Sequence, residues 1–85
     1  MKIYDYKGKK NISGERIREA RHKLRLSQQN LAAQMQIHEI ILERESISRI
    51  ENGTRFVTDY EIAIFAKVLH VSTNWLLGLT DNPNE

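Results

Sequence analysis

Residues 45–53 read ESISRIENG, and this stretch has the pattern of a short helix with one narrow apolar stripe. Ile47 and Ile50 stand three residues apart, which places both side chains on the same face of a helix. Gly53 follows at the position where a left-handed residue commonly ends a helix. With Arg44 added at its start, the pattern predicts a helix over 44–52. Its other faces carry more polar side chains than a helix that only packs against the core would need.

Four further helices are predicted around this one. The first should span about 13–24, and the last should end before Gly78. In the fourth, Glu61 completes a capping box, and His70 is expected in a left-handed conformation at the end of the helix. Each helix begins at a residue that suits the N-cap position, namely Ser13, Ser27, Thr58 and Ser72. The fold class is therefore all-α, and 85 residues are enough for only one core.

Residues 36–43, QIHEIILE, are the ambiguous part of the chain. They contain no glycine, proline or asparagine, yet the chain must turn before the next helix. Their isoleucines could prolong the second helix or pack down as a compact loop. The pattern leaves both alternatives open.

The composition excludes several classes of protein. The chain has no cysteine, so neither disulfides nor thiolate metal sites are available. The three histidines lack metal-ligand spacing, and neither a glycine-rich phosphate loop nor a nucleophile–base arrangement is present. We therefore expect no catalytic residue, no metal and no cofactor. No apolar run reaches the roughly 20 residues of a membrane span, and the start lacks a secretory signal pattern, so a soluble, cytoplasmic protein is expected.

The charge is distributed unevenly. Residues 1–30 carry nine Lys or Arg and three acidic residues, whereas residues 31–85 carry four basic and eight acidic ones. Such an asymmetry indicates an anionic partner for one side of the molecule, nucleic acid being the usual candidate. A solvated basic helix with a charged tail is the alternative that the charge alone leaves open.

Four segments in this order resemble the phage lambda repressor and Cro type of helix-turn-helix domain, also called XRE-type. They are RIREARHKLRLSQQNLA (16–32), SISRIENG (46–53), VTDYEIAIFAKVL (57–69) and HVSTNWLLG (70–78). The resemblance implies a compact five-helix DNA-binding domain over 12–79. Outside that range, residues 1–11 are expected to be a flexible basic arm, because KGKK has no helical pattern and Gly8 interrupts it, and residues 80–85 are expected to be a frayed tail because of their turn-forming composition.

The connection between the second and third helices departs from the common pattern of that family. Fourteen residues separate Ala32 from Ile47, which is longer than usual, and the customary glycine is missing. The chain is more similar to a longer-turn variant in which Glu39 occupies the glycine position. The angle between the two helices therefore cannot be copied from members with a short turn.

The resemblance makes 44–52 the recognition helix, and its side chains have suitable chemistry for that role. The residues expected to read base edges are Arg44, Glu45, Ser48 and Arg49. Arginine forks suit guanine in the major groove, serine can donate or accept, and glutamate can accept from cytosine. Glu45 has an alternative role at the positive end of its own helix.

Phosphate contacts are expected from the flanks of this helix. The residues are Ser27, Gln28, Asn52, Thr54 and Arg55, with capping as an alternative for Ser27. The lysines of the arm could also reach a groove, or could form an attractive tail. The resemblance further implies a structural ion pair between Arg21 and Glu51, which belongs to the fold and not to the readout.

The predicted function is a sequence-specific regulator of transcription that binds double-stranded DNA, a repressor acting as a homodimer on a two-fold operator. Leu79 is the preferred interface residue, whereas Trp75 is expected in the core. No small-molecule effector domain fits in the chain. The alternative is an antitoxin-like module that binds a regulatory protein partner, with or without DNA, through the apolar segment IHEIIL.

Overall fold

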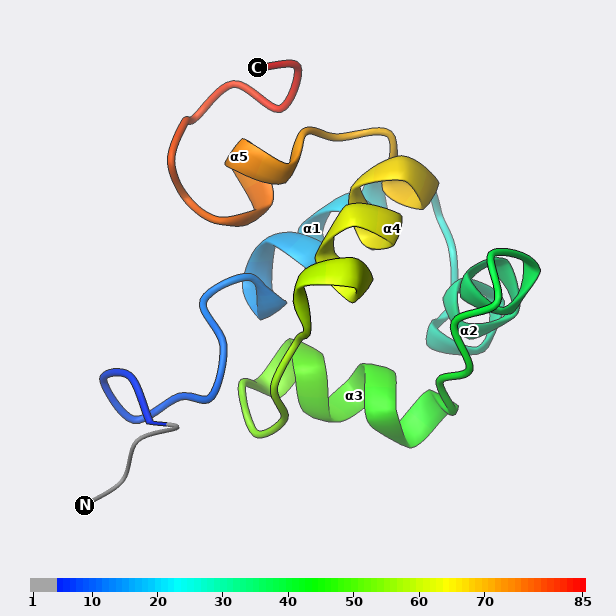
Figure 1. Ribbon diagram of the computed structural model, residues 1–85. Helices are drawn as coiled ribbons and strands as arrows, with labels where there is room; N and C mark the ends of the chain where they lie inside the picture. The colour runs from blue at the N-terminus through cyan, green and yellow to red at the C-terminus, as the bar shows by residue number, and fades with distance from the viewer. Residues whose placement is uncertain (1–4) are drawn as a thin grey trace.

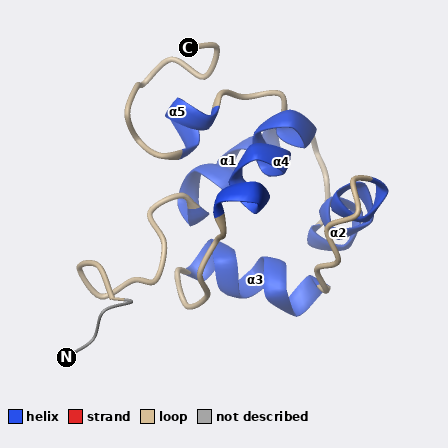
Figure 2. Cartoon of the chain, viewed as in Figure 1, coloured by secondary structure: helices blue, strands red, loops and turns tan. Residues whose placement is uncertain are grey.

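The computed structural model describes residues 5–85 and contains five helices within that range (Figures 1 and 2). They are α1 (Gly14–Lys23), α2 (Gln28–Ile37), α3 (Arg44–Asn52), α4 (Asp59–Leu69) and α5 (Thr73–Leu76). No strand occurs in this part of the chain, so the all-α prediction is confirmed. None of these helices is both long and apolar enough to cross a membrane.

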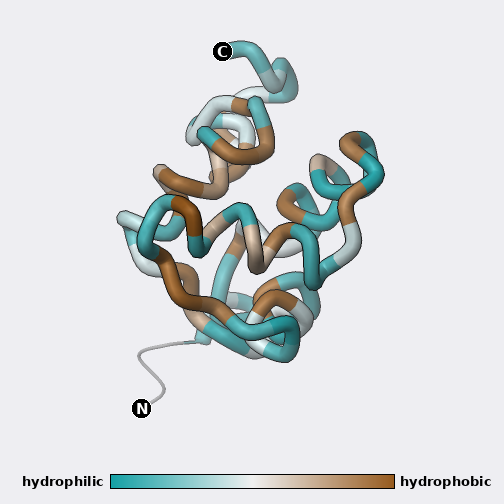
Figure 3. The backbone as a smooth tube through the Cα atoms, turned by 90° about the vertical axis from the view of Figure 1, so that its right-hand side faces the viewer, coloured by the Kyte–Doolittle hydropathy of each residue, from teal (hydrophilic) through white to brown (hydrophobic). Residues whose placement is uncertain are grey.

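One apolar core joins the helices. Along the chain, apolar positions recur between polar ones (Figure 3), and each helix turns its apolar positions inward because burial removes them from water. The side chains that are fully buried at the centre include Ile17, Leu31, Met35, Ile47, Ile50, Phe65 and Leu76. Helix α3 packs on α1 and α2, and α4 packs on α1, α2 and α5.

Local capping explains most of the helix ends. Thr58 Oγ1 accepts from the Glu61 N–H, and the Glu61 carboxylate accepts from the Thr58 N–H, so the predicted capping box is confirmed. Gly53 and His70 have φ of 81° and 59°, the left-handed C-caps expected for α3 and α4. The expected side-chain cap by Ser13 is wrong. Its backbone lies in the helical region (φ −104°, ψ −12°), and it makes no side-chain capping bond.

The connection between α2 and α3 is a compact loop, not a longer helix. Helix α2 ends at Ile37, and Glu39 adopts a left-handed φ of 66° at the position where the resemblance placed a glycine. Beyond that turn Ile40 packs partly against the core and Leu42 is buried, 8% exposed. These two side chains anchor the longer turn, while Ile37 and Ile41 remain exposed.

The two end segments make hydrogen bonds to the helical part of the chain. In the described part of the N-terminal segment, residues 5–11, a tight turn lies against the end of α3, and the Lys10 N–H donates to Gly53 O at 2.8 Å. Residues 80–85 fold back toward α5, where the Ser72 N–H donates to Pro83 O at 2.8 Å. Arg16 adds hydrogen bonds to Thr80 O and the Asp81 carboxylate.

Candidate nucleic-acid interface

The outer face of α3 is polar and open to solvent. Arg44, Glu45 and Arg49 are exposed, and Ser48 is partly exposed. The spacing of these four positions places them on one side of the helix. Ile47 and Ile50 point the other way and are both 0% exposed. The helix is therefore held by its apolar stripe, and the α2–α3 connection does not cover its polar face.

The two arginines of this face are differently engaged. An Arg44 nitrogen lies 3.4 Å from a Glu45 carboxylate oxygen, and both side chains are more than half exposed. An exposed pair of this kind contributes about 0–1 kcal/mol, so it can exchange for a base contact at little cost. For Arg49, no ion pair or side-chain hydrogen bond is formed within residues 5–85. Its guanidinium is free to meet a ligand.

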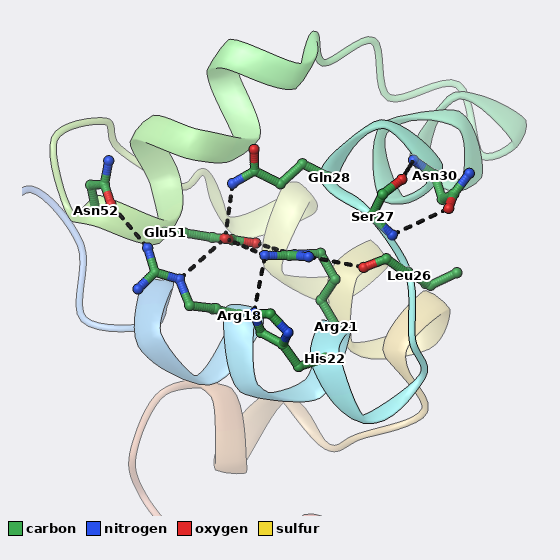
Figure 4. Close-up of polar contacts among 9 residues, drawn as sticks. All are labelled: Arg18, Arg21, His22, Leu26, Ser27, Gln28, Asn30, Glu51 and Asn52. Atoms are coloured by element: carbon green, nitrogen blue, oxygen red, sulfur yellow. Dashed lines mark hydrogen bonds and ion pairs between the residues drawn. The ribbon is translucent and has the colours of Figure 1, made fainter.

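Behind this face, the Glu51 carboxylate is the centre of a buried polar cluster (Figure 4). Arg21 Nε donates to Glu51 Oε2 at 2.7 Å, and Arg21 Nη2 donates to Oε1 at 2.9 Å. The pair implied by the family resemblance is thus in contact. Arg18 Nε and Gln28 Nε2 also donate to Oε1, at 3.3 and 3.1 Å. The cluster links α1, the start of α2 and α3.

The environment of Glu51 favours its charged form. Burial by itself raises the pKa of this carboxyl group, because it disfavours the charge. Hydrogen bonds from Arg21 and Gln28, the positive charge of Arg21 and a bond from Arg18 outweigh burial and hold the pKa of Glu51 below its usual value. The carboxylate is therefore ionised and fully paired at neutral pH.

The N-terminus of α2 presents the first two residues expected to contact phosphate. Ser27 Oγ accepts from the Asn30 N–H at 2.9 Å, and Asn30 Oδ1 accepts from the Ser27 N–H at 3.2 Å, so the serine is the helix cap. The Gln28 amide group donates to Glu51. Its side chain is consequently held in a defined place beside the free N–H groups of the first helical turn, which favour an anion.

The end of α3 and the loop after it hold the other three residues expected to contact phosphate, namely Asn52, Thr54 and Arg55. Arg18 Nη2 donates to Asn52 Oδ1 at 3.0 Å, and the Thr54 hydroxyl donates to Arg49 O at 3.3 Å. Asn52 and Thr54 are both exposed. Arg55, half-buried, is engaged with both carboxylate oxygens of Glu61 at 3.1 and 3.2 Å, and therefore braces the start of α4.

Comparison with known families identifies this arrangement. A model described as a helix-turn-helix domain matches residues 14–82, which include all five helices. The chain belongs to the helix-turn-helix family, of the XRE type. No curated protein and no solved structure matches it. Helix-turn-helix domains bind DNA, with the first helix of the motif against the backbone and the second in the major groove. The matched residues include α2 and α3, the two helices joined by the longer turn.

The contacts of two residues beside this site, Arg18 and Asn11, were not predicted from the sequence. Arg18 shares the charge of Glu51, and it stands three residues before Arg21 on the same face of α1, so helical spacing could have revealed it. Asn11 Nδ2 donates to Ile50 O and Arg55 O, at 3.0 and 2.8 Å, and Asn11 Oδ1 accepts from the Gly14 N–H. These partners are far apart in the sequence, and no local pattern indicates them.

Proposed function

We propose that this protein is a transcriptional repressor that acts in the cytoplasm and inserts α3 into the major groove of a specific double-stranded site. The observation that supports this most strongly is the open polar face of α3 above a rigid base. Ile47 and Ile50 fix the helix from below, and Glu51 ties its last turn to α1 and α2. Because such a helix is already ordered before binding, contacts with base edges would carry no entropic cost of folding the helix.

Each side chain of the α3 face has a proposed role. Arg49 is the main base reader, because its guanidinium is free and can bind guanine O6 and N7 together. Arg44 reads a second base after it leaves Glu45. Ser48, between them, serves as a donor or acceptor, and Glu45 accepts from a cytosine amine when Arg44 is engaged with DNA.

The flanks of α3 would hold the sugar–phosphate backbone. On one side the N-terminus of α2, with Ser27 and Gln28, faces a phosphate. On the other side Asn52 and Thr54 contact the next turn of the backbone, and Arg55 positions that loop through its bond to Glu61. Such contacts set register and affinity but carry no sequence information.

We further propose that two copies bind a two-fold site, with the end of the chain as the interface. Trp75 is 4% exposed and belongs to the core, whereas Leu79 is 73% exposed. At this end of the described chain, Leu79 is therefore an apolar side chain that a second copy could contact. Sedimentation with and without DNA tests this, and Leu79→Asp should prevent pairing while leaving the monomer folded.

Selection of bound fragments from a random duplex pool tests the readout itself. A consensus should emerge, and Arg49→Ala should lose about 1–3 kcal/mol on it and relax preference at one position. Gln28→Ala should instead weaken all sequences alike. Lys23→Ala, which removes an exposed charge from the end of α1, is the control and should leave both preference and affinity nearly unchanged. An Arg49→Ala protein that selects the same consensus would rule out the assignment of α3.

A second candidate function rests on the α2–α3 connection. Ile37 and Ile41 are 71% and 74% exposed, which is unusual for two large apolar side chains so close in sequence. They could form the contact surface of an antitoxin-like module for a protein partner. A stable complex with the product of a neighbouring gene, lost in Ile37→Ser/Ile41→Ser, would support that function. Binding of DNA by the same double variant would separate the two activities.

A further inference from the structure

The described part of the N-terminal segment contains a hairpin that has no counterpart in the helical motif. The Tyr6 N–H donates to Lys9 O at 2.7 Å, and the Lys9 N–H donates to Tyr6 O at 3.0 Å. The two residues between them, Lys7 and Gly8, both have positive φ, 52° and 84°. This is the conformation of the primed two-residue turns that close tight hairpins.

This basic hairpin, residues 5–10, is attached to the end of α3. The Lys10 N–H donates to Gly53 O at 2.8 Å. The Lys9 side chain lies directly over Gly53, so closely that a Cβ built on the glycine would approach Lys9 Cδ to 2.7 Å. Next to the hairpin, Asn11 bonds to Ile50 O and Arg55 O on either side of the same glycine. The hairpin is therefore in direct contact with the C-terminal end of α3.

The hairpin presents three lysines to solvent. Lys7 Nζ lies 5.4 Å from the centre of the Tyr6 ring, and Lys10 Nζ lies 5.6 Å from the centre of the Phe56 ring. Contacts of this kind hold a cation over the aromatic face at a small gain in free energy. Lys9 instead approaches Glu15 at 3.9 Å, so its charge is partly compensated. Lys7 and Lys10 are the two positive charges held ready for an anion.

We propose that the basic hairpin is a second DNA-binding element, which grips backbone phosphates beyond the C-terminal end of α3. This rests on the proposed function, because it assumes that α3 lies in a groove. Asn52 and Thr54 are proposed to contact the backbone at that end of α3, and the hairpin that carries the exposed lysines is attached there through Gly53. Contacts from Lys7 and Lys10 would lengthen the footprint without adding to sequence preference.

The attachment of the hairpin to Gly53 distinguishes it from a flexible charged tail. A tail that is merely attractive raises affinity wherever its charges are, since it samples many positions along the duplex. A hairpin bonded to Gly53 meets particular phosphates and has already lost its conformational freedom before binding. Its contribution should therefore depend on the turn as well as on the charges.

The first experiment removes the charges and keeps the fold. Affinity for a short duplex of random sequence is measured for the wild type and for Lys7→Gln/Lys10→Gln over a range of salt concentrations. Each lost phosphate contact should reduce the magnitude of the negative slope of log K against log salt by about 0.9, so the slope of the double variant should be about 1.8 less steep. Between about 50 and 200 mM salt the wild type should then weaken roughly 12-fold more than the variant. Lys23→Gln is the control: it makes the same Lys-to-Gln change at the end of α1 away from the hairpin, and it should alter the affinity and the salt slope little.

The second experiment keeps the charges and disrupts the turn. Gly8→Val meets no steric obstacle, since nothing lies within 4 Å of the added Cβ, but a β-branched residue strongly disfavours a φ of +84°. We expect it to weaken binding several-fold with an unchanged melting temperature. Wild-type affinity in Gly8→Val together with weakened Lys7→Gln/Lys10→Gln would show a charged tail and overturn the proposal.

The outcomes also separate this inference from the proposed function. If the wild type selects a consensus and the lysine variant keeps both affinity and salt slope, the hairpin is not a DNA contact although α3 is. If the wild type binds no duplex at all, the DNA-binding function fails and the hairpin proposal fails with it. Backbone footprints give an independent reading: the protected stretch of backbone next to the α3 contact should shorten in Lys7→Gln/Lys10→Gln and in Gly8→Val, but not in Lys23→Gln.

Discussion

Disruption of the Glu51–Arg21 pair provides the most direct test of how the domain is held together. The Glu51 side chain is 0% exposed and that of Arg21 is 10% exposed, with an ionic hydrogen bond of 2.7 Å between them. Glu51→Leu would leave the guanidinium buried without its partner, and breaking a buried pair in this way costs about 3–5 kcal/mol. A chain of this length has a total stability of about 4–13 kcal/mol, from roughly 0.05–0.15 kcal/mol per residue. The variant should therefore lose a large part of its stability.

A double-mutant cycle measured by urea unfolding isolates the pair. Arg21→Met should also destabilise, because the buried Glu51 carboxylate keeps only its bonds from Arg18 and Gln28 and because the bond from Arg21 to Leu26 O at 2.9 Å is lost. The double variant removes both charges, and its loss should fall short of the sum of the single losses by about 2 kcal/mol or more, since groups in direct contact are coupled. If either single variant is too unstable to fold, the double variant should still fold and show a cooperative unfolding transition, because it leaves neither charge of the pair buried without its partner. Single losses that add within about 0.5 kcal/mol would refute the reasoning.

Two further predictions concern stability. Glu51 and Glu61 each have a pKa held below its usual value despite burial, by hydrogen bonds from Arg21 and from Arg55 respectively. The two ionised carboxylates stabilise the folded state fully above the unfolded carboxyl pKa of about 4.3, and this stabilisation is lost as the pH falls through their lower folded pKa values. The urea concentration at the unfolding midpoint should therefore decrease below about pH 4. A midpoint that stays constant from about pH 7 to about pH 3 would contradict this. Glu39→Gly should raise the free energy of unfolding by about 0.5–1 kcal/mol, because it relieves the left-handed strain at φ 66°. Glu39→Ala keeps that strain and should give no gain, and equal effects of the two changes would show that φ is not the cause.

The helices could be predicted from the sequence because their signals are local. The stripe of Ile47 and Ile50, followed by Gly53, indicated a helix over 44–52, and α3 has those bounds. The capping box of Thr58 shows the same agreement between a short motif and a helix start. Ser13 had the right chemistry for a cap but an unsuitable backbone conformation, and conformation before a helix depends on what the preceding residues contact. Here Asn11 makes those contacts.

The partners of individual side chains were less predictable. Helical periodicity indicates which positions face solvent, as it does for Arg49, but it does not identify what a charged group on the next helix meets. Arg55 lies beside Glu61 because the loop after α3 turns toward the start of α4. The position of the basic hairpin likewise depends on Gly53 being close enough for Lys9 to lie on it. These relations arise from packing, and a single sequence carries no direct signal for them.

The Glu51 cluster also explains how the domain tolerates a long turn in its DNA-binding motif. The connection between α2 and α3 bends at Glu39 and is anchored by the buried side chain of Leu42, so its extra length is accommodated at the surface. The two helices are also joined directly by the hydrogen bond from Gln28 at the start of α2 to Glu51 at the end of α3. Because Gln28 is also proposed to contact phosphate, one side chain would connect the backbone contact to the reading helix. Gln28→Ala should consequently weaken binding by more than one lost phosphate contact, while Gln28→Glu, which sets two carboxylates side by side, should weaken it further and destabilise the fold.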